Sequence, residues 1–363
     1  MSKYIFLLFS LSIVFYSSSA QDCAAKTGAW KAGMRGSQAG TATDLAKEKK
    51  LVDAIHNMIK AKYTPAGVEA NYTGAYSANS NAPGNNYYYS IIPLNYYCEG
   101  NTVKVAHETS TYFSINANFF DAEIYEPVNF TEEASGTGYR YIPDMPVEKD
   151  GYWYFKERDA GLGFGMTGKA SSWLITYNGK LPFAYVTKKE FLETQKVILA
   201  NAMRSASSGF KDVLDRIEIE KGFKEKEYKN DPEKLKRYMT MDYNDTKARY
   251  EKLIADNDKK FKPAFTKLES QLKMSEAELN QPAIVKQDPN DHLAFLFTDD
   301  NDPMGQVLIK PNPGYFNKKL PRSSPQFFWV YVRANHKEPV ASKFMADIMK
   351  AVDFGTLKAM LGK

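Results

Sequence analysis

Residues 169–203 read KASSWLITYNGKLPFAYVTKKEFLETQKVILANAM, and the predicted fold is built outward from this stretch. Two short apolar runs, residues 173–177 and 181–186, flank Asn178-Gly179. Asn-Gly between such runs is the strongest short-range signal of a β-hairpin, because a type I′ turn needs positive φ at both central residues. We therefore expect a hairpin that is apolar on both faces and lies inside a covered sheet. Pro182 lacks an N–H, which predicts an edge strand or a bulge there.

A helical pattern follows this predicted hairpin directly. Thr187 and Glu190 have the spacing of a capping box, in which each residue satisfies an unpaired N–H of the other at the start of a helix. Charged residues and helical spacing continue to about residue 281. Asp231-Pro232 marks a further helix start, and Ser275 with Glu278 forms another capping box. Sustained heptads are absent, so a true coiled coil is not supported and we expect a bundle or a long helical hairpin.

Strand-like patterns lie on both sides of this helical region. The strands predicted before it are residues 68–76, 88–97, 102–107, 112–119 and 152–155, and those after it are 292–297, 306–309 and 326–333. Further helices are predicted at residues 44–63, 339–354 and 356–361, and residues 127–150 are expected to be irregular. This order lacks regular βαβ alternation, so the sequence predicts an α+β fold of antiparallel sheets, with a charged helical insertion between the β regions. The pattern leaves open whether the two β regions share one sheet.

The first twenty residues have the composition of an export signal. Lys3 is followed by an apolar run at residues 4–16 and by Ser18-Ser19-Ala20, a small-residue cleavage site. The run is too short to span a bilayer, so we expect an exported protein, periplasmic or extracellular, with no transmembrane anchor after cleavage. The expected division is a signal peptide (1–20), a flexible leader (21–43), a helix with a β-rich region (44–186), the helical insertion (187–281), and strands and helices that pack back on the core (282–363).

Composition places the chain among globular proteins. Hydrophobic residues make up 43% of the 363 residues and aromatic residues 14%, enough to fill a sizeable core. The net charge of +5 is mild for this length and does not indicate a nucleic-acid binder. In an oxidising compartment Cys23 and Cys98 are expected to form a disulfide, and the alternative is two unpaired thiols. With two Cys and four His, a Cys/His zinc framework is not supported.

A glycine-rich segment matches two nucleotide-binding patterns in part. Residues 163–168 satisfy GxGxxG, and residues 163–169 match the first seven positions of GxxxxGK[ST]. Ala170 stands where a P-loop needs a hydroxyl for Mg²⁺, and a strand follows where both motifs need a helix. We therefore interpret the glycines as a bulged approach to the hairpin, and expect no cofactor.

Two groups of polar residues raise the possibility of a reaction or a metal site. His107, Glu108, Asp121 and Glu123 lie at the ends of neighbouring predicted strands and could form a general acid–base or hydrolytic metal site. Adjacent residues of a strand point to opposite faces, which favours ordinary surface residues instead. Asp299, Asn301 and Asp302 offer oxygen ligands suited to Ca²⁺, but the EF-hand spacing is absent and an acidic turn is favoured.

Tyrosines interleaved with Asn and Ser form the most plausible binding surface in the sequence. Exposed Tyr rings present apolar faces with polar edges, which can stack on sugars or peptides. The alternative is that alternate tyrosines are half-buried sheet positions whose hydroxyls reach water. The candidate binding residues are Tyr72, Tyr76, Tyr87, Tyr89 and Tyr96.

Residues 173–192 (WLITYNGKLPFAYVTKKEFL) and 310–328 (KPNPGYFNKKLPRSSPQFF) resemble segments of exported bacterial proteins of unknown function. The resemblance implies export and a shared fold, and no activity. We expect an exported, non-enzymatic protein that binds a protein or a glycan at the cell envelope. The alternative is a secreted or periplasmic hydrolase that uses the His/carboxylate site. A third possibility is an architectural protein whose helical insertion mediates assembly, and the sequence leaves the oligomeric state open.

Overall fold

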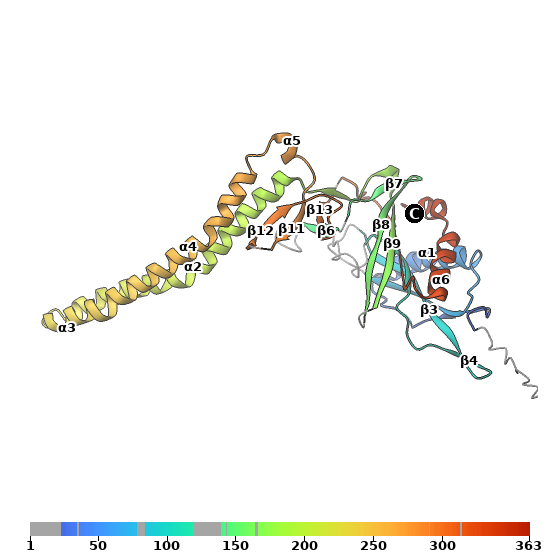
Figure 1. Ribbon diagram of the computed structural model, residues 1–363, viewed down its shortest axis with the longest axis horizontal. Coiled ribbons are helices and arrows are strands. Elements are labelled where there is room, and N and C mark those ends of the chain that lie inside the picture. The colour runs from blue at the N-terminus through green and yellow to red at the C-terminus, as the bar shows by residue number, and fades with distance from the viewer. Residues whose placement is uncertain are drawn as a thin grey trace, which may run out of the picture.

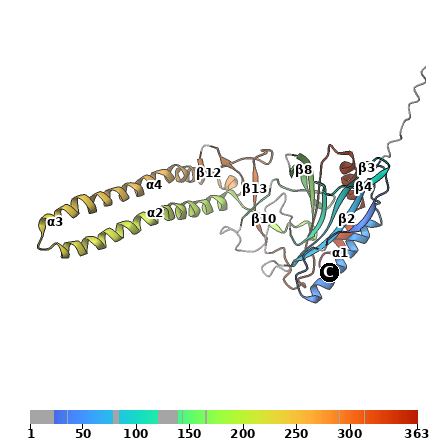
Figure 2. The same cartoon turned by 90° about the horizontal axis from the view of Figure 1, so that it is seen from below.

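The computed structural model describes residues 23–34, 36–77, 84–119, 139–142, 144–163, 166–289, 291–312 and 314–363. These residues form a β-rich body, from which a long arm of two antiparallel helices (residues 188–271) projects (Figures 1 and 2). The arm is the charged helical insertion expected between two β regions, and both sheets are almost wholly antiparallel. The predicted α+β class is confirmed.

A nine-stranded sheet forms the centre of the body. Its order is β1 (Ala29–Ala32), β2 (Val68–Ser77), β3 (Asn86–Glu99), β5 (Tyr112–Ala117), β14 (Phe328–Ala334), β9 (Met166–Ile175), β8 (Tyr152–Gly163) and β7 (Val147–Lys149), with β4 (Thr102–Val105) paired to β3. β14 follows the arm in sequence, yet it lies between β5 and β9, which precede the arm. The two β regions therefore share one sheet.

Three helices cover one face of this sheet: α1 (Ala42–Lys60), α6 (Pro339–Ala351) and α7 (Phe354–Met360) (Figure 1). Ile55 and Ile59 from α1 and Phe344 and Ile348 from α6 are buried against it in one apolar cluster. Such burial follows from the i, i+4 spacing of these residues, which places them on one side of each helix.

A second, five-stranded sheet packs on the opposite face. It consists of β10 (Phe183–Tyr185), β13 (Gln306–Pro311), β11 (Ile284–Asp288) and β12 (Asp291–Phe297), with β6 (Arg140–Ile142) paired to β13. Leu174 and Trp329 of the large sheet share a buried cluster with Phe183 and Ile309 of the small one. The outer face of the small sheet is covered by the base of the arm, where Phe191 and Leu268 are buried. The layers of the molecule are therefore, in order, the three helices, the large sheet, the small sheet and the base of the arm.

The arm begins with α2 (Lys188–Glu227) and returns through α3 (Pro232–Arg237), a π-helical segment η2 (Tyr238–Asn244) and α4 (Asp245–Gln271). The short α5 (Glu276–Leu279) leads back to the body. The capping box predicted at Thr187 and Glu190 is present at the start of α2, and a second one starts α5 at Ser275. At 1.5 Å per residue, the 40 residues of α2 span about 60 Å.

The expectation of a long helical hairpin in the insertion is confirmed, because α2 and α4 run antiparallel and pack against each other along the arm (Figure 2). The residues that face the other helix recur at alternating steps of three and four, as expected for two helices packed side by side. On α2 they are Met203, Ser207, Phe210, Leu214, Ile217, Lys221 and Lys224, and on the returning helix Tyr243, Lys247, Tyr250, Ile254, Asn257, Phe261, Ala264 and Leu268. Ser207 and Asn257 meet in this seam, where Asn257 Nδ2 donates to Ser207 Oγ over 2.7 Å. Polar residues at several of these positions interrupt the apolar pattern of the seam.

The predicted hairpin at Asn178-Gly179 is wrong. Residues 177–179 form a short 3₁₀ turn, η1 (Tyr177–Gly179), and Asn178 does not adopt the positive φ that a type I′ turn requires. β9 and β10, on the two sides of this turn, belong to different sheets. Both edges of β9 are taken, one by β8 and the other by seven consecutive residues of β14, so no edge is left for residues 181–186. Long-range pairing overrides the local turn signal.

Two hairpins form instead on the N-terminal side of β9. Asp150 and Gly151 have φ values of 55° and 80° and join β7 to β8 as a two-residue loop, which corrects the expectation that residues 127–150 are irregular throughout. In the next hairpin β8 and β9 are paired as far as Gly163 and Met166, and residues 164–165 of the glycine-rich segment lie outside the described residues. A register shift between Gly161 and Gly163 agrees with the predicted bulge. A strand follows Lys169, so the segment lacks the helix that binds phosphate in both nucleotide motifs.

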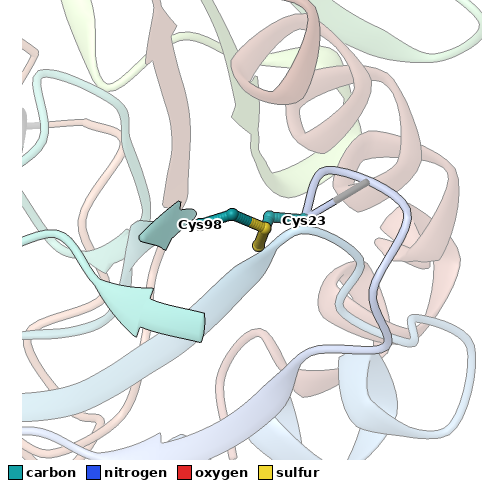
Figure 3. Close-up of a disulfide and its surroundings, with 2 residues drawn as sticks. All are labelled: Cys23 and Cys98. Atoms are coloured by element: carbon teal, nitrogen blue, oxygen red, sulfur yellow. A yellow bond between two sulfur atoms is a disulfide. The ribbon is translucent and has the colours of Figure 1, made fainter. Parts of the chain in front are cut away.

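The predicted disulfide is present between Cys23 and Cys98 (Figure 3). Its Cα atoms are 5.9 Å apart, and it closes a sequence separation of 75 residues by tying the N-terminal segment to β3. Among the described residues, no helix is long and apolar enough to cross a membrane. The predicted signal peptide at residues 1–20 lies outside the described residues.

Candidate binding site

A cleft of about 380 Å³ opens on the helix-covered side of the large sheet, beside α7. Four aromatic residues line it together with one acid and one base. The lining residues are Lys149, Asp150, Tyr152, Tyr154, Trp173 and Phe354. They come from β7, β8, β9 and α7, and from the β7–β8 turn.

Strand alternation brings these side chains to one face. Tyr152 and Tyr154 are two residues apart on β8 and therefore project on the same side of the sheet. Trp173 of β9 lies directly opposite Tyr154, and Lys149 of β7 lies opposite Tyr152. Phe354 begins α7, whose start is capped by Asp353 accepting from the Thr356 N–H over 2.9 Å.

The four rings touch one another at right or oblique angles. The Tyr154 and Trp173 centroids are 5.5 Å apart, those of Trp173 and Phe354 5.9 Å, and those of Tyr152 and Phe354 5.1 Å. Lys358 Nζ lies 5.5 Å from the Tyr152 centroid, a cation–π contact at the edge of the cleft. These contacts hold the rings in a fixed arrangement, so a ligand meets a preformed surface.

The ring spacing bears on the kind of aromatic site that the cleft can form. An aromatic cage holds a methylated ammonium group in a space that several rings surround. Ring centroids separated by 5.1–5.9 Å belong to rings that already touch, which leaves no such space between them. The space of about 380 Å³ lies beside these touching rings, where a ligand can lie across a ring face, as the apolar face of a sugar does. Lys149 and Asp150 at the same cleft can donate to and accept from hydroxyl groups.

Two other hollows have fewer features of a ligand site than the aromatic cleft. One at the base of the arm, lined by Phe191 and Leu268 among others, has a volume of about 20 Å³, room for about one water. The other is an open groove of about 700 Å³ along α4, where Lys259, Lys262 and Lys267 gather around Pro263. The residues that line the groove include no aromatic residue, so it has fewer of the features of a ligand site.

Burial excludes most of the predicted tyrosine surface. Tyr87 and Tyr89 are 1% and 0% exposed, and Tyr76 is also buried, so their rings fill the core under α1 and cannot stack on a ligand. Burial raises the pKa of Tyr76 to about 12, and raises the pKa of Tyr87 and of Tyr89 as well. The half-buried Tyr72 stacks on His56 with ring centroids 3.9 Å apart, and Tyr96 is partly buried on β3. The burial of these tyrosines fits the alternative in which they are sheet positions better than it fits an exposed binding surface.

The residues of the predicted hydrolytic site are not gathered within the described part of the chain. His107 and Glu108 are exposed in the loop after β4, and Asp121 and Glu123 lie outside the described residues. In the parts of the chain that the structure describes, no group of three or more His, Cys, Asp or Glu side chains could hold a metal. The hydrolase alternative stays a prediction.

The acidic loop proposed for Ca²⁺ is held together by its own hydrogen bonds. Asp302 accepts from Lys286 Nζ over 2.6 Å and from the Thr298 hydroxyl over 2.7 Å, and its other oxygen accepts from the Met304 N–H. These donors lower the pKa of Asp302 to about 2. Asp299 accepts from the Asn301 N–H over 2.8 Å. The carboxylates are engaged as in an acidic turn, the interpretation that the sequence favoured.

Sequence reasoning missed all four aromatic residues of the cleft as a site. Part of the signal was present, because Asp150-Gly151 is a hairpin dipeptide and Tyr152 and Tyr154 alternate after it. No local pattern places Phe354 beside Trp173, since the two lie far apart in sequence and the contact depends on how α7 returns to the sheet. No protein-family model matches the chain, and no curated protein and no solved structure matches it.

Proposed function

We propose that this is an exported, non-enzymatic protein that binds a neutral glycan of the cell envelope in the cleft formed by Tyr152, Tyr154, Trp173 and Phe354. The carrying observation is the directly opposed Tyr154–Trp173 pair, which presents two preformed ring surfaces on one side of a rigid sheet. Ring faces with polar edges suit a sugar, which has an apolar face and hydroxyl groups around it.

The charge of the cleft supports a neutral ligand. The lining holds one charge of each sign, Lys149 and Asp150, and the Lys358 ammonium at the edge lies against the Tyr152 ring, so the lining favours an uncharged ligand over a strongly charged one. A peptide is the competing ligand, because β7 is an edge strand that could accept another strand. β7 has only three residues, and the next stretch of β8 carries the charged run Lys156–Asp159, which disfavours strand addition.

Export is the second part of the proposal. The N-terminal residues have the composition of a signal peptide, and the Cys23–Cys98 disulfide is typical of proteins that fold in an oxidising compartment. The resemblance of residues 173–192 and 310–328 to exported bacterial proteins agrees with this location. Fractionation of the native host, with detection of the cleaved mature chain, tests it independently of ligand binding.

The cleft is tested by screening neutral oligosaccharides against the full mature protein and measuring the best ligand by titration calorimetry. Tyr154→Ala should weaken binding about tenfold, since loss of one aromatic contact of up to 1.5 kcal/mol corresponds to roughly that factor. Tyr97→Ala is the matched control, because Tyr97 is 44% exposed on β3 and lies in the tyrosine-rich region that the sequence favoured. Thermal unfolding of both variants separates lost binding from lost folding. Equal weakening by both variants, or binding of peptides and no sugar, would contradict the proposal.

A further inference from the structure

The arm carries an unpartnered face as well as its internal seam. Six residues of α2 lie on the side directed away from α4, again at alternating steps of four and three, and all are exposed. We call them the outer stripe: Ser205, Gly209, Asp212, Arg216, Ile219 and Phe223. In a simple two-helix hairpin, each helix needs only the stripe that faces its partner helix. α2 carries that stripe and, on the opposite side, the outer stripe as well.

The ends of the outer stripe differ in size. Ile219 and Phe223, toward the tip, are 63% and 66% exposed, which is unusual for large apolar side chains that lie side by side on a helix. Ser205 and Gly209, toward the base, are small. A Cβ added at Gly209 would meet nothing within 4 Å, so no contact within this chain requires a glycine there. Glycine inside a helix costs about 1 kcal/mol relative to alanine, which favours a role for the open surface at this point.

The middle of the stripe carries two opposite charges. Asp212 and Arg216 are four residues apart on adjacent turns. Arg216 Nε donates to the main-chain oxygen of Asp212 over 3.3 Å, and neither side chain forms an ion pair with any described residue. Both charged groups are therefore available to an external partner.

We propose that the outer stripe is a self-complementary interface, on which α2 packs antiparallel against α2 of a second copy about a two-fold axis beside residue 214. In a two-fold interface residue i faces residue j, and j faces i. This axis sets Asp212 opposite Arg216 of the second copy. By symmetry Arg216 then lies opposite Asp212 of the second copy, so the interface contains two ion pairs. It also sets Ile219 over Gly209 and Phe223 over Ser205 of the second copy, so each large apolar side chain meets a small residue.

The shape of the molecule permits this arrangement. Residue 214 is 26 positions beyond Lys188, or about 39 Å along the helix, so the axis lies well outside the body. The arm of one chain projects far from its body (Figure 2), so in the proposed pair the two bodies lie at opposite ends of the paired arms, each beyond the tip of the other arm. The two cleft-bearing bodies would present two glycan sites from one assembly, although the interface itself does not depend on what the cleft binds.

A pair of charge reversals tests the interface on the full mature protein, with sedimentation velocity over a range of concentrations as the readout. Asp212→Arg sets two arginines against each other, and Arg216→Asp sets two aspartates against each other. Each variant alone should associate at least tenfold more weakly than the wild type. An equimolar mixture of the two variants should recover association, because each Arg pair of one chain then meets the Asp pair of the other.

Asp256→Arg on the exposed side of α4 is the matched control and should leave association unchanged. Circular dichroism at 222 nm verifies that the arm stays helical in every variant. A wild-type chain that remains monomeric at all concentrations would overturn the proposal. So would association that is unaffected by either reversal, or a mixture that stays monomeric although the wild type associates.

Discussion

The body and the arm obtain their stability in different ways. In the body, β14 is buried on both faces between two strands and two layers, and Trp329, Val330 and Tyr331 are fully enclosed. In the outer half of the arm, the seam is two helices thick and includes Lys221, Lys224 and Lys247. The layered body can hold a fixed cleft, because further layers pack against the residues that line it. The two-helix arm has no such layers to hold a cleft, and its long exposed faces suit contacts with other molecules.

The two regions can be observed separately. All four tryptophans, at positions 30, 153, 173 and 329, lie in the body, so tryptophan fluorescence reports on the body alone. The longest helices, α2 and α4, lie in the arm and dominate the circular dichroism signal at 222 nm. The first two predictions below use this difference directly, and the third concerns the body alone.

The largest expected effect is on the body. Replacing both cysteines, Cys23→Ser with Cys98→Ser, frees a loop with a sequence separation of 75 residues, and the chain-entropy model gives a loss of about 4 kcal/mol in unfolding free energy. Urea unfolding followed by tryptophan fluorescence should show a lower midpoint, and reduction of the wild type should reproduce it. An unchanged midpoint would mean that the N-terminal segment contributes little to the body.

A smaller effect is expected in the seam of the arm. Asn257→Ala leaves the buried Ser207 hydroxyl without its 2.7 Å partner, which costs about 1–3 kcal/mol. The signal at 222 nm should be lost at lower temperature, while tryptophan fluorescence changes less. The double variant Ser207→Ala with Asn257→Leu removes both polar partners and should recover most of the loss. If fluorescence and dichroism shift together, the arm and the body unfold as one unit.

The smallest effect concerns a buried carboxyl group of the body. Glu48 on α1 is 0% exposed, and among the described residues only one of its oxygens has a partner, Asn85 Nδ2 at 2.8 Å. Burial raises the pKa of Glu48 above its usual value, although the Asn85 hydrogen bond lowers it in part. The folded state therefore binds the proton more tightly than the unfolded state, and stability is lost as pH rises from the unfolded pKa through the folded one.

Glu48→Gln removes this titration and keeps an oxygen that accepts from Asn85. The variant should be more stable than the wild type at pH 7 and about equally stable at pH 4, as measured by thermal unfolding. Glu193→Gln on the exposed surface of α2 serves as the control and should leave stability unchanged at both pH values. A Glu48→Gln variant less stable than the wild type at pH 7 would show that the ionised carboxylate is favourable in the fold.

Local signals predicted local structure well where the interaction itself is local. The capping boxes at Thr187 and Ser275 form as expected, because their hydrogen bonds join residues three positions apart. The hairpin predicted at Asn178-Gly179 does not form, because a long-range interaction competes with the local signal. The edge of β9 that this hairpin needed is occupied by β14, which follows the whole arm in sequence. The helical hairpin was expected, but the pairing of Ser207 with Asn257 in its seam was not, because these two residues satisfy each other and do not follow an apolar pattern.

The proposed site and the site expected from the sequence are both aromatic, but they lie at different places in the fold. Aromatic stacking was expected, but on strands whose tyrosines Tyr87 and Tyr89 are core residues. Alternation along a strand tells which residues share a face, and it does not tell which face a helix covers. Here α1 covers the tyrosines of β3, while Tyr152 and Tyr154 of β8 line a cleft beside α7.

The central claim is that the supported rings of the body form the ligand site. The most direct measurement is a crystal structure of the mature protein with the tightest-binding neutral oligosaccharide from the screen. We expect a sugar ring lying across Trp173 and Tyr154, with hydroxyl groups near Lys149 and Asp150. A sugar bound elsewhere, whether on the strands of β2 and β3, beside His107 or along the arm, would contradict the account.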